Sequence, residues 1–216
     1  MAKLQRQDYQ GAGSDFNEAL RLNPNYAEAY YGRGRVRYFL YDDRGAILDF
    51  NEAIRLKPNY AEAYYGRALA HMYVEAYEAS SNDFLTALRL QPDYAEQPDL
   101  WSDFGQLLLA VGENEEALAH FNEALRLQSN HADAHYGRAL ARYKLNGDLR
   151  AFISELEGTA RLYREQGDTQ SFSETVAEIN RARDHLNQQN VGNRQDDSVV
   201  CNTWDDYANA GSRRCR

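Results

Sequence analysis

Histidines and carboxylates are the side chains of this sequence that could bind a metal ion or transfer protons. His131 and His135 lie four residues apart, which places both on one face of a helix at the spacing of a metal-ligand pair. The segment around these histidines resembles two segments earlier in the chain, which have tyrosines at the same positions. We therefore interpret the histidines as replacements of these tyrosines, and a pair of metal ligands is the alternative. The Asp and Glu residues are expected mainly on exposed helix faces, and no conspicuous pair of carboxylates lies among apolar residues, as acid–base catalysis would require. We therefore expect no enzyme activity, no catalytic residue, no metal and no other cofactor.

The 27 residues at the C-terminal end differ in composition from the rest of the chain. Residues 190–216 have no periodicity and few apolar side chains, which is typical of a flexible tail. Both cysteines of the chain, Cys201 and Cys215, lie there, and we interpret them as incidental thiols, with a local disulfide or a metal site as the alternatives. Trp204 and Tyr207 could form a short docking motif within this tail.

The rest of the chain is built from a repeat of 34 residues. The segment PNYAEAYYGR occupies residues 24–33 and again 58–67, and HADAHYGR at 131–138 is a looser copy. A second family of segments comprises FNEALRL at 16–22, FNEAIRL at 50–56 and FNEALRL at 121–127. Identical ten-residue segments at a fixed offset indicate an array of repeated structural units, each of which buries its apolar face against its neighbours.

Each repeat carries small, aromatic and helix-breaking residues at fixed positions. Counting from Ala27, the first full copy has Gly34 at position 8, Ala46 at 20, Phe50 at 24 and Pro58 at 32. Small residues allow two helices to approach closely, the aromatic ring fills the space between them, and proline ends the second helix. We expect Phe50 and its counterpart Phe121 to be buried, and the Asn or Asp that follows the proline position to cap the next helix. These capping candidates are Asn25, Asn59, Asp93 and Asn130.

This spacing resembles the tetratricopeptide-repeat (TPR) family over residues 1–166, and is most similar to the tandem repeats of bacterial TPR proteins. The resemblance implies an all-α, right-handed superhelical solenoid of antiparallel pairs of helices, A and B, with roughly ten helices and no sheet. The expected divisions are a partial first repeat at 1–26 that lacks most of helix A, full repeats at 27–60, 61–94 and 98–131, a repeat at 132–167 with a lengthened helix B, a capping helix at 168–189 and the tail at 190–216.

Two departures from the repeat pattern are expected to matter. Because the sequence begins inside a repeat, the first helix B should be partly bare around Phe16 and Leu20. Either the sequence is truncated, or a partner or a second copy of the chain covers this edge. Residues 95–97 form a three-residue insertion before Pro98. We expect the insertion to alter the local superhelical twist.

Composition and charge narrow the classes of partner. The formal net charge is −9, so an electrostatic drive towards nucleic acid is absent and anionic membrane surfaces are disfavoured. No segment approaches the roughly 18 apolar residues of a membrane-spanning helix, and the N-terminal residues lack the apolar core of a secretory signal. We expect a soluble, cytoplasmic protein that does not insert into a membrane.

In the TPR family the concave groove is lined chiefly by helix A positions 2, 5, 9 and 12. Carried over to this sequence, these positions predict a groove lined by tyrosines with an acidic rim. Tyrosines provide a large contact area and are enriched at binding hot spots, although packing between repeats is the alternative role. The expected function is a scaffold or adaptor that binds a peptide or helix of a partner protein; the alternative is an assembly protein that self-associates through its incomplete first repeat. The predicted groove residues are Glu28, Tyr31, Arg35, Tyr38, Glu62, Tyr65, Leu69, Met72, Gln106, Tyr136, Leu140 and Tyr143.

Overall fold

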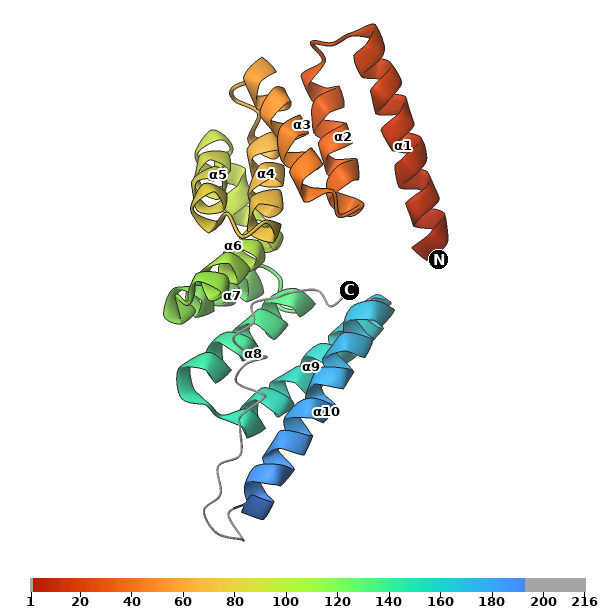
Figure 1. The fold of residues 1–216 in the computed structure, drawn as a ribbon. Coiled ribbons are helices and arrows are strands. Elements are labelled where there is room, and N and C mark those ends of the chain that lie inside the picture. The colour runs from red at the N-terminus through yellow and green to blue at the C-terminus, as the bar shows by residue number, and fades with distance from the viewer. Residues whose placement is uncertain (1, 193–216) are drawn as a thin grey trace. The chain divides into compact units, whose positions relative to one another are not determined.

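The structure, a computed structural model, describes residues 2–192, with side chains placed from residue 8 to residue 188. Over this range the chain folds into ten α-helices and one short 3-10 helix, and no strand is present (Figure 1). This confirms the all-α fold of tandem helix pairs that the 34-residue period predicts. The chain divides into two compact units, residues 1–95 and 96–216, and the division falls within the three-residue insertion.

Unit 1 contains two complete helix pairs preceded by a single long helix. The helices are α1 (Ala2–Leu22), α2 (Ala27–Phe39), α3 (Asp43–Leu56), α4 (Ala61–Tyr73) and α5 (Tyr77–Leu90), and the 3-10 helix η1 (Pro92–Glu96) follows across the boundary. Each helix packs most extensively against its neighbours in sequence, and the A helices α2 and α4 also contact each other directly.

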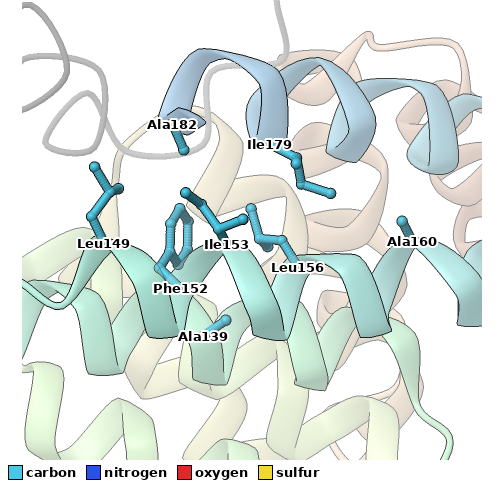
Figure 2. Packing of buried hydrophobic residues seen from close by; sticks show 8 residues of the cluster. All are labelled: Ala139, Leu149, Phe152, Ile153, Leu156, Ala160, Ile179 and Ala182. Carbon is cyan, nitrogen blue, oxygen red and sulfur yellow. The ribbon is translucent and has the colours of Figure 1, made fainter. Parts of the chain in front are cut away.

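Unit 2 repeats this arrangement with a longer last pair. Its helices are α6 (Pro98–Val111), α7 (Asn114–Leu127), α8 (Ala132–Asn146), α9 (Leu149–Gln166) and α10 (Thr169–Gly192). The A helices α6 and α8 contact each other, and α10 packs along α9. Figure 2 shows apolar side chains of α8, α9 and α10 meeting in the core of this unit. These core residues are Ala139, Leu149, Phe152, Ile153, Leu156, Ala160, Ile179 and Ala182.

The aromatic residue of helix B is the centre of each repeat core. Phe50 is 1% exposed and Phe121 is fully buried, which confirms that both rings fill the space between helices A and B. The ring of Phe50 lies so close to Gly34 of its own repeat and Gly66 of the next that a Cβ on either glycine would lie within 2.9 Å of ring carbons. Two glycines therefore make room for one aromatic ring, as the small residues of the repeat predict.

The helix starts correct one detail of the sequence analysis. Helices α2 and α4 begin after Tyr26 and Tyr60, and neither start has a side-chain cap. Asn25 instead donates its backbone N–H to the side chain of Asn23 at 3.1 Å, so it belongs to the turn before the helix. Side-chain caps stand mainly elsewhere, for example at Asp42, whose carboxylate accepts the N–H of Gly45 at 3.0 Å.

The turn between helices A and B requires a left-handed backbone, and the two units meet this requirement differently. Unit 1 has Tyr41 and Glu75 there, with φ of 64° and 61°. Unit 2 has Gly112 and Gly147, with φ of 88° and 69°. Residues with a Cβ carry a steric cost in this conformation that glycine does not.

Helix α2 covers part of the first helix. Leu20 is buried at 8% exposure, and Phe16 is half-buried with its ring against Gly32 of α2. Nearer the N-terminus of α1, the ring of Tyr9 stacks on Phe39 of α2 at a centroid distance of 5.1 Å. The face around Phe16 and Leu20 is thus bare only in part, because α2 already packs against it.

Candidate functional site

The predicted groove residues lie on the A helices of the two units, which we describe separately. In unit 1, the exposed side chains are Glu28, Arg35 and Glu62, and the half-buried ones are Tyr31, Tyr38, Tyr65, Leu69 and Met72. We call these eight residues of α2 and α4 the A-helix face. In unit 2, the half-buried side chains are Gln106 of α6 and Tyr136, Leu140 and Tyr143 of α8.

Tyrosines on the A-helix face are held by other aromatic rings beneath them. The ring of Tyr31 packs against Tyr60 at 5.0 Å and Phe50 at 6.0 Å between centroids. One repeat later, Tyr65 packs in the same way against Tyr94 and Phe84, both at 5.7 Å. Ring pairs at these distances are favourable, so each tyrosine is fixed from below and retains partial exposure.

Three further contacts involve side chains of this face. The guanidinium of Arg35 lies over the rings of Tyr31 and Phe39, 5.8 and 5.9 Å from their centroids. Tyr38 of α2 packs against Tyr73 of α4 at 5.6 Å. The structure therefore brings Tyr31 and Arg35 together as one aromatic–cationic pair and links α2 to α4 through a second aromatic pair.

Burial favours the neutral phenol at Tyr31 of this face and at Tyr60 and Tyr94 beneath it. Burial raises the pKa of Tyr31 and of Tyr60, and it raises the pKa of Tyr94 to about 12. The negative charge of Glu62 adds to the increase at all three tyrosines, so this carboxylate lies within electrostatic reach of each phenol. At neutral pH these hydroxyls are hydrogen-bond donors and acceptors without charge.

In unit 2 the predicted tyrosines interact mainly with their own core. The hydroxyl of Tyr136 donates to Glu178 of α10 at 2.7 Å, and the ring of Tyr143 stacks on Phe152 at 5.0 Å. Glu178 is 5% exposed, and burial raises the pKa of its carboxyl, opposed by the hydrogen bond from Tyr136 and by Arg181. Leu140 packs against the same core. Tyr136, Leu140 and Tyr143 therefore contribute to packing among the helices of unit 2.

Buried carboxylates are the functional-looking residues that the sequence analysis missed. Asp49 and Asp83 are 2% and 5% exposed, whereas we expected the acidic residues mainly on exposed helix faces. Asp49 accepts two hydrogen bonds from Arg33, at 2.6 and 2.8 Å, and lies 2.9 Å from Arg37. Each pair joins helix A to helix B of one repeat, so the role that the contacts support is structural.

The second repeat keeps this buried pair, with a histidine as the second neighbour of the carboxylate in place of an arginine. Asp83 accepts two hydrogen bonds from Arg67, at 2.6 and 2.8 Å, and its other neighbour is His71 at 3.1 Å. A signal for these pairs is present in the sequence. The Arg after each YYG segment recurs 16 residues before an Asp that directly precedes Phe50 or Phe84. A charged residue that recurs in phase with buried aromatics indicates a buried pair.

The histidine pair divides into two separate roles. His131 caps α8 by accepting the N–H of Ala134 at 3.2 Å through Nδ1, and its Nε2 lies 2.8 Å from Asp99. His135 lies 2.8 Å from the carbonyl oxygen of Ser129. Within the described part of the chain, no group of three or more His, Cys, Asp or Glu side chains could hold a metal ion. Cys201, Cys215, Trp204 and Tyr207 lie outside the described residues.

None of the described helices is long and apolar enough to cross a lipid bilayer.

Comparison with known proteins agrees with this architecture. The family model described as TPR repeat matches residues 2–39, 42–73 and 105–146, which is more than half of the chain, and a second model, tetratricopeptide repeat, matches residues 61–94. No protein of curated function shows significant similarity in sequence.

Several solved structures have a similar fold. A crystal structure of MamA is 20% identical, with a TM-score of 0.60, over 77% of this chain and 95% of that one. YrrB, a TPR protein with an unusual peptide-binding site, is 18% identical, with a TM-score of 0.56, over 79% and 93% of the two chains. MamA from Desulfovibrio magneticus RS-1, also 18% identical, has a TM-score of 0.63 over 76% and 90%. At these identities the likeness shows the fold alone.

Proposed function

Because the chain belongs to the tetratricopeptide-repeat family, we propose that it is a protein-interaction adaptor that binds a segment of a partner protein on the A-helix face of unit 1. The bound segment is extended or helical, and it carries basic and apolar side chains. The family membership supports an interaction scaffold in general, and the similar fold of YrrB, a TPR protein with a peptide-binding site, agrees with that class of function.

The observation that carries this proposal is the packing of Tyr31 and Tyr65. Each ring is fixed by two aromatic neighbours and remains partly exposed. A side chain that is already ordered loses little conformational entropy when a partner covers it, and interface hot spots are enriched in tyrosine for this reason among others. These two residues are therefore the best candidates for anchors.

The side chains around the anchors define the chemistry of the partner. Leu69 and Met72 are half-buried apolar residues on α4, and methionine adapts its shape to different ligands. Glu28 and Glu62 are exposed carboxylates in the first turns of α2 and α4. Apolar surface beside negative charge is complementary to a segment in which hydrophobic and basic residues occur together.

The test is a binding experiment with anchor variants. The chain captures its partner from an extract of the source cells, the bound segment is mapped, and its affinity is then measured by titration. The double variant Tyr31→Ala/Tyr65→Ala is expected to bind the segment more weakly by a factor well above about thirtyfold, because each interface anchor contributes about 2 kcal/mol or more, which alone corresponds to about thirtyfold. Circular dichroism establishes that the variant retains its helices.

The matched control removes exposed apolar residues from the B helices. Leu48 of α3 and Leu85 of α5 are 65% and 52% exposed, and Leu48→Ala/Leu85→Ala should leave the affinity unchanged. Undiminished binding by a folded double tyrosine variant contradicts the proposal. Measurement of molecular size over a concentration series separates partner binding from the alternative, self-association through the first repeat.

A further inference from the structure

The second position of each full repeat holds a carboxylate, and three of these four acids have a partner within the chain. We call Glu28, Glu62, Asp99 and Asp133 the position-2 acids. Asp99 lies 2.8 Å from Nε2 of His131, and Asp133 accepts the hydroxyl of Tyr163 at 2.5 Å. Glu28 lies 3.4 Å from the ammonium group of Lys57. For Glu62, no hydrogen bond or ion pair is observed with any of the described residues.

The repeat of Glu28 shows how a cation is held beside this acid. Lys57 directly follows helix B of its repeat, and its Nζ lies 4.2 Å above the centre of the Tyr60 ring while bonding to Glu28. An aromatic face and a carboxylate attract an ammonium group from two directions. The first full repeat therefore contains its own cation in a site built from an acid and a tyrosine.

The next repeat keeps the acid and the tyrosine but has lost the lysine. Gln91 stands where the preceding repeat has Lys57, and the backbone at the two positions is nearly identical, with φ and ψ of −136° and 87° against −136° and 86°. Tyr94 corresponds to Tyr60 and packs on the tyrosine of its own helix A as Tyr60 does. A neutral glutamine cannot balance the charge of Glu62, which remains exposed to solvent.

We propose that Glu62 receives the side-chain cation of a lysine or arginine in the partner segment, at the site that Lys57 fills in the preceding repeat. This inference rests on the proposed function and specifies one contact of it. Tyr94, the counterpart of Tyr60 in the filled site, packs on the anchor Tyr65 at 5.7 Å between ring centroids, and the negative charge of Glu62 contributes to the raised pKa of Tyr94. Glu62 therefore places a basic residue of the partner next to the tyrosine that anchors the segment.

The experiment uses the full chain and a fluorescein-labelled octalysine peptide as the probe, with binding measured by fluorescence anisotropy at low salt. Glu62→Gln is expected to weaken binding about threefold to fivefold, the range of a single exposed ion pair. Glu78→Gln is the matched control, because Glu78 is likewise exposed in the first turn of its helix, α5, and the substitution changes the net charge equally. It should leave binding within about 1.5-fold of the parent, as expected for a screened distant charge.

A second pair of variants fills the site from within. Gln91→Lys should weaken octalysine binding by the same factor as Glu62→Gln, because the new ammonium group pairs with Glu62. The control is Gln128→Lys, which adds the same charge at the equivalent end of α7, where Asp99 already has His131. Conversely, Lys57→Gln should strengthen binding by opening the site at Glu28.

Equal losses for Glu62→Gln and Glu78→Gln, or equal effects of Gln91→Lys and Gln128→Lys, would overturn the inference, because net charge would then account for binding. Such a result does not contradict the proposed function, because that function is tested by titrating the tyrosine variants with the mapped partner segment. If the tyrosine variants lose partner binding while all charge variants bind octalysine equally, the proposed function is supported and the inference about Glu62 is contradicted.

Discussion

Two successive repeats of unit 1, residues 27–60 and 61–94, are near copies inside and differ at their surface. Their cores share an aromatic ring, Phe50 or Phe84, and a buried carboxylate bonded twice by an arginine. At the end of helix B, Lys57 pairs with an acid and a tyrosine, whereas the neutral Gln91 stands at the corresponding position, and the corresponding acid has no ion pair among the described residues. The comparison teaches that one surface substitution can change a filled site into an open one while the scaffold beneath it is preserved.

The largest expected effect tests whether the two cores are equivalent. Phe50→Ala and Phe84→Ala should each lower the free energy of unfolding by about 3–5 kcal/mol, because both rings are 1% exposed and their removal leaves a cavity. Chemical denaturation followed by far-ultraviolet circular dichroism measures the loss. Leu48→Ala, at an exposed position of α3, should cost less than about 0.5 kcal/mol. Strongly unequal losses for the two variants would show that the two cores are not equivalent.

The buried carboxylates give the next largest effect. Asp49→Asn and Asp83→Asn should each cost about 2–3 kcal/mol, because either change leaves partly buried arginines, Arg33 and Arg37 or Arg67, without their full complement of acceptors. Burial alone would raise the pKa of Asp83, but the hydrogen bonds from Arg67 and His71 outweigh burial and lower it. Since the folded pKa is lowered, this stabilisation is complete above the ordinary value of 3.8 and is lost as the pH falls through the folded pKa.

Acid titration of stability therefore provides the measurement for Asp83. The difference in unfolding free energy between the parent chain and Asp83→Asn should be constant near neutral pH and should shrink on acidification below about pH 4. A difference that stays constant down to pH 2 would show that the carboxylate is not the titrating group.

The left-handed turns give a smaller effect of opposite sign. Glu75→Gly and Tyr41→Gly should each stabilise unit 1 by about 0.5–1 kcal/mol, because glycine removes the steric cost of a positive φ at the position where unit 2 already has glycine. Thermal unfolding measures the gain. Gly112→Ala in unit 2 is the reverse experiment and should destabilise; a loss of stability in both unit 1 variants would mean that the side chains contribute more than the strain costs.

The smallest effect concerns the filled site itself. Lys57→Gln should cost less than about 0.5 kcal/mol, and Gln91→Lys should add a similar amount, because exposed ion pairs and cation–aromatic contacts are weak in water. Paired melting curves of the two variants measure the difference. A cost above about 1.5 kcal/mol for Lys57→Gln would identify the lysine as a structural element and weaken its use as a template for the open site.

The helices and the core followed from the sequence because both depend on periodicity. The 34-residue offset places Phe50 and Phe121 at equivalent positions, and any arrangement of repeated helix pairs buries them in the same way. The buried acids were harder to predict because Asp49 is polar by type and becomes buried only through an arginine 16 residues away. Helix caps also escaped prediction, since Asn25 is used by a local turn instead of the helix start.

The candidate site shows a similar division. Its residues could be named from repeat positions, but Glu28 and Glu62 are indistinguishable in the motif YAEAY. Only the structure shows that a residue 29 positions downstream reaches Glu28, and that the corresponding position near Glu62 ends in a neutral amide. Long-range pairing between one helix start and the following helix end is the information that periodicity does not contain.

The shared contact of one ring with two glycines has a consequence for how such a chain can lengthen. Phe50 touches Gly34 in its own repeat and Gly66 in the next. A duplication of 34 residues within residues 27–94 therefore supplies a matching ring and glycine at each new junction. An inserted segment of any other length separates them, and after the insertion at residues 95–97 the glycine position is occupied by Asp103. Repeats before that point can thus be gained or lost without selection having to rebuild an interface.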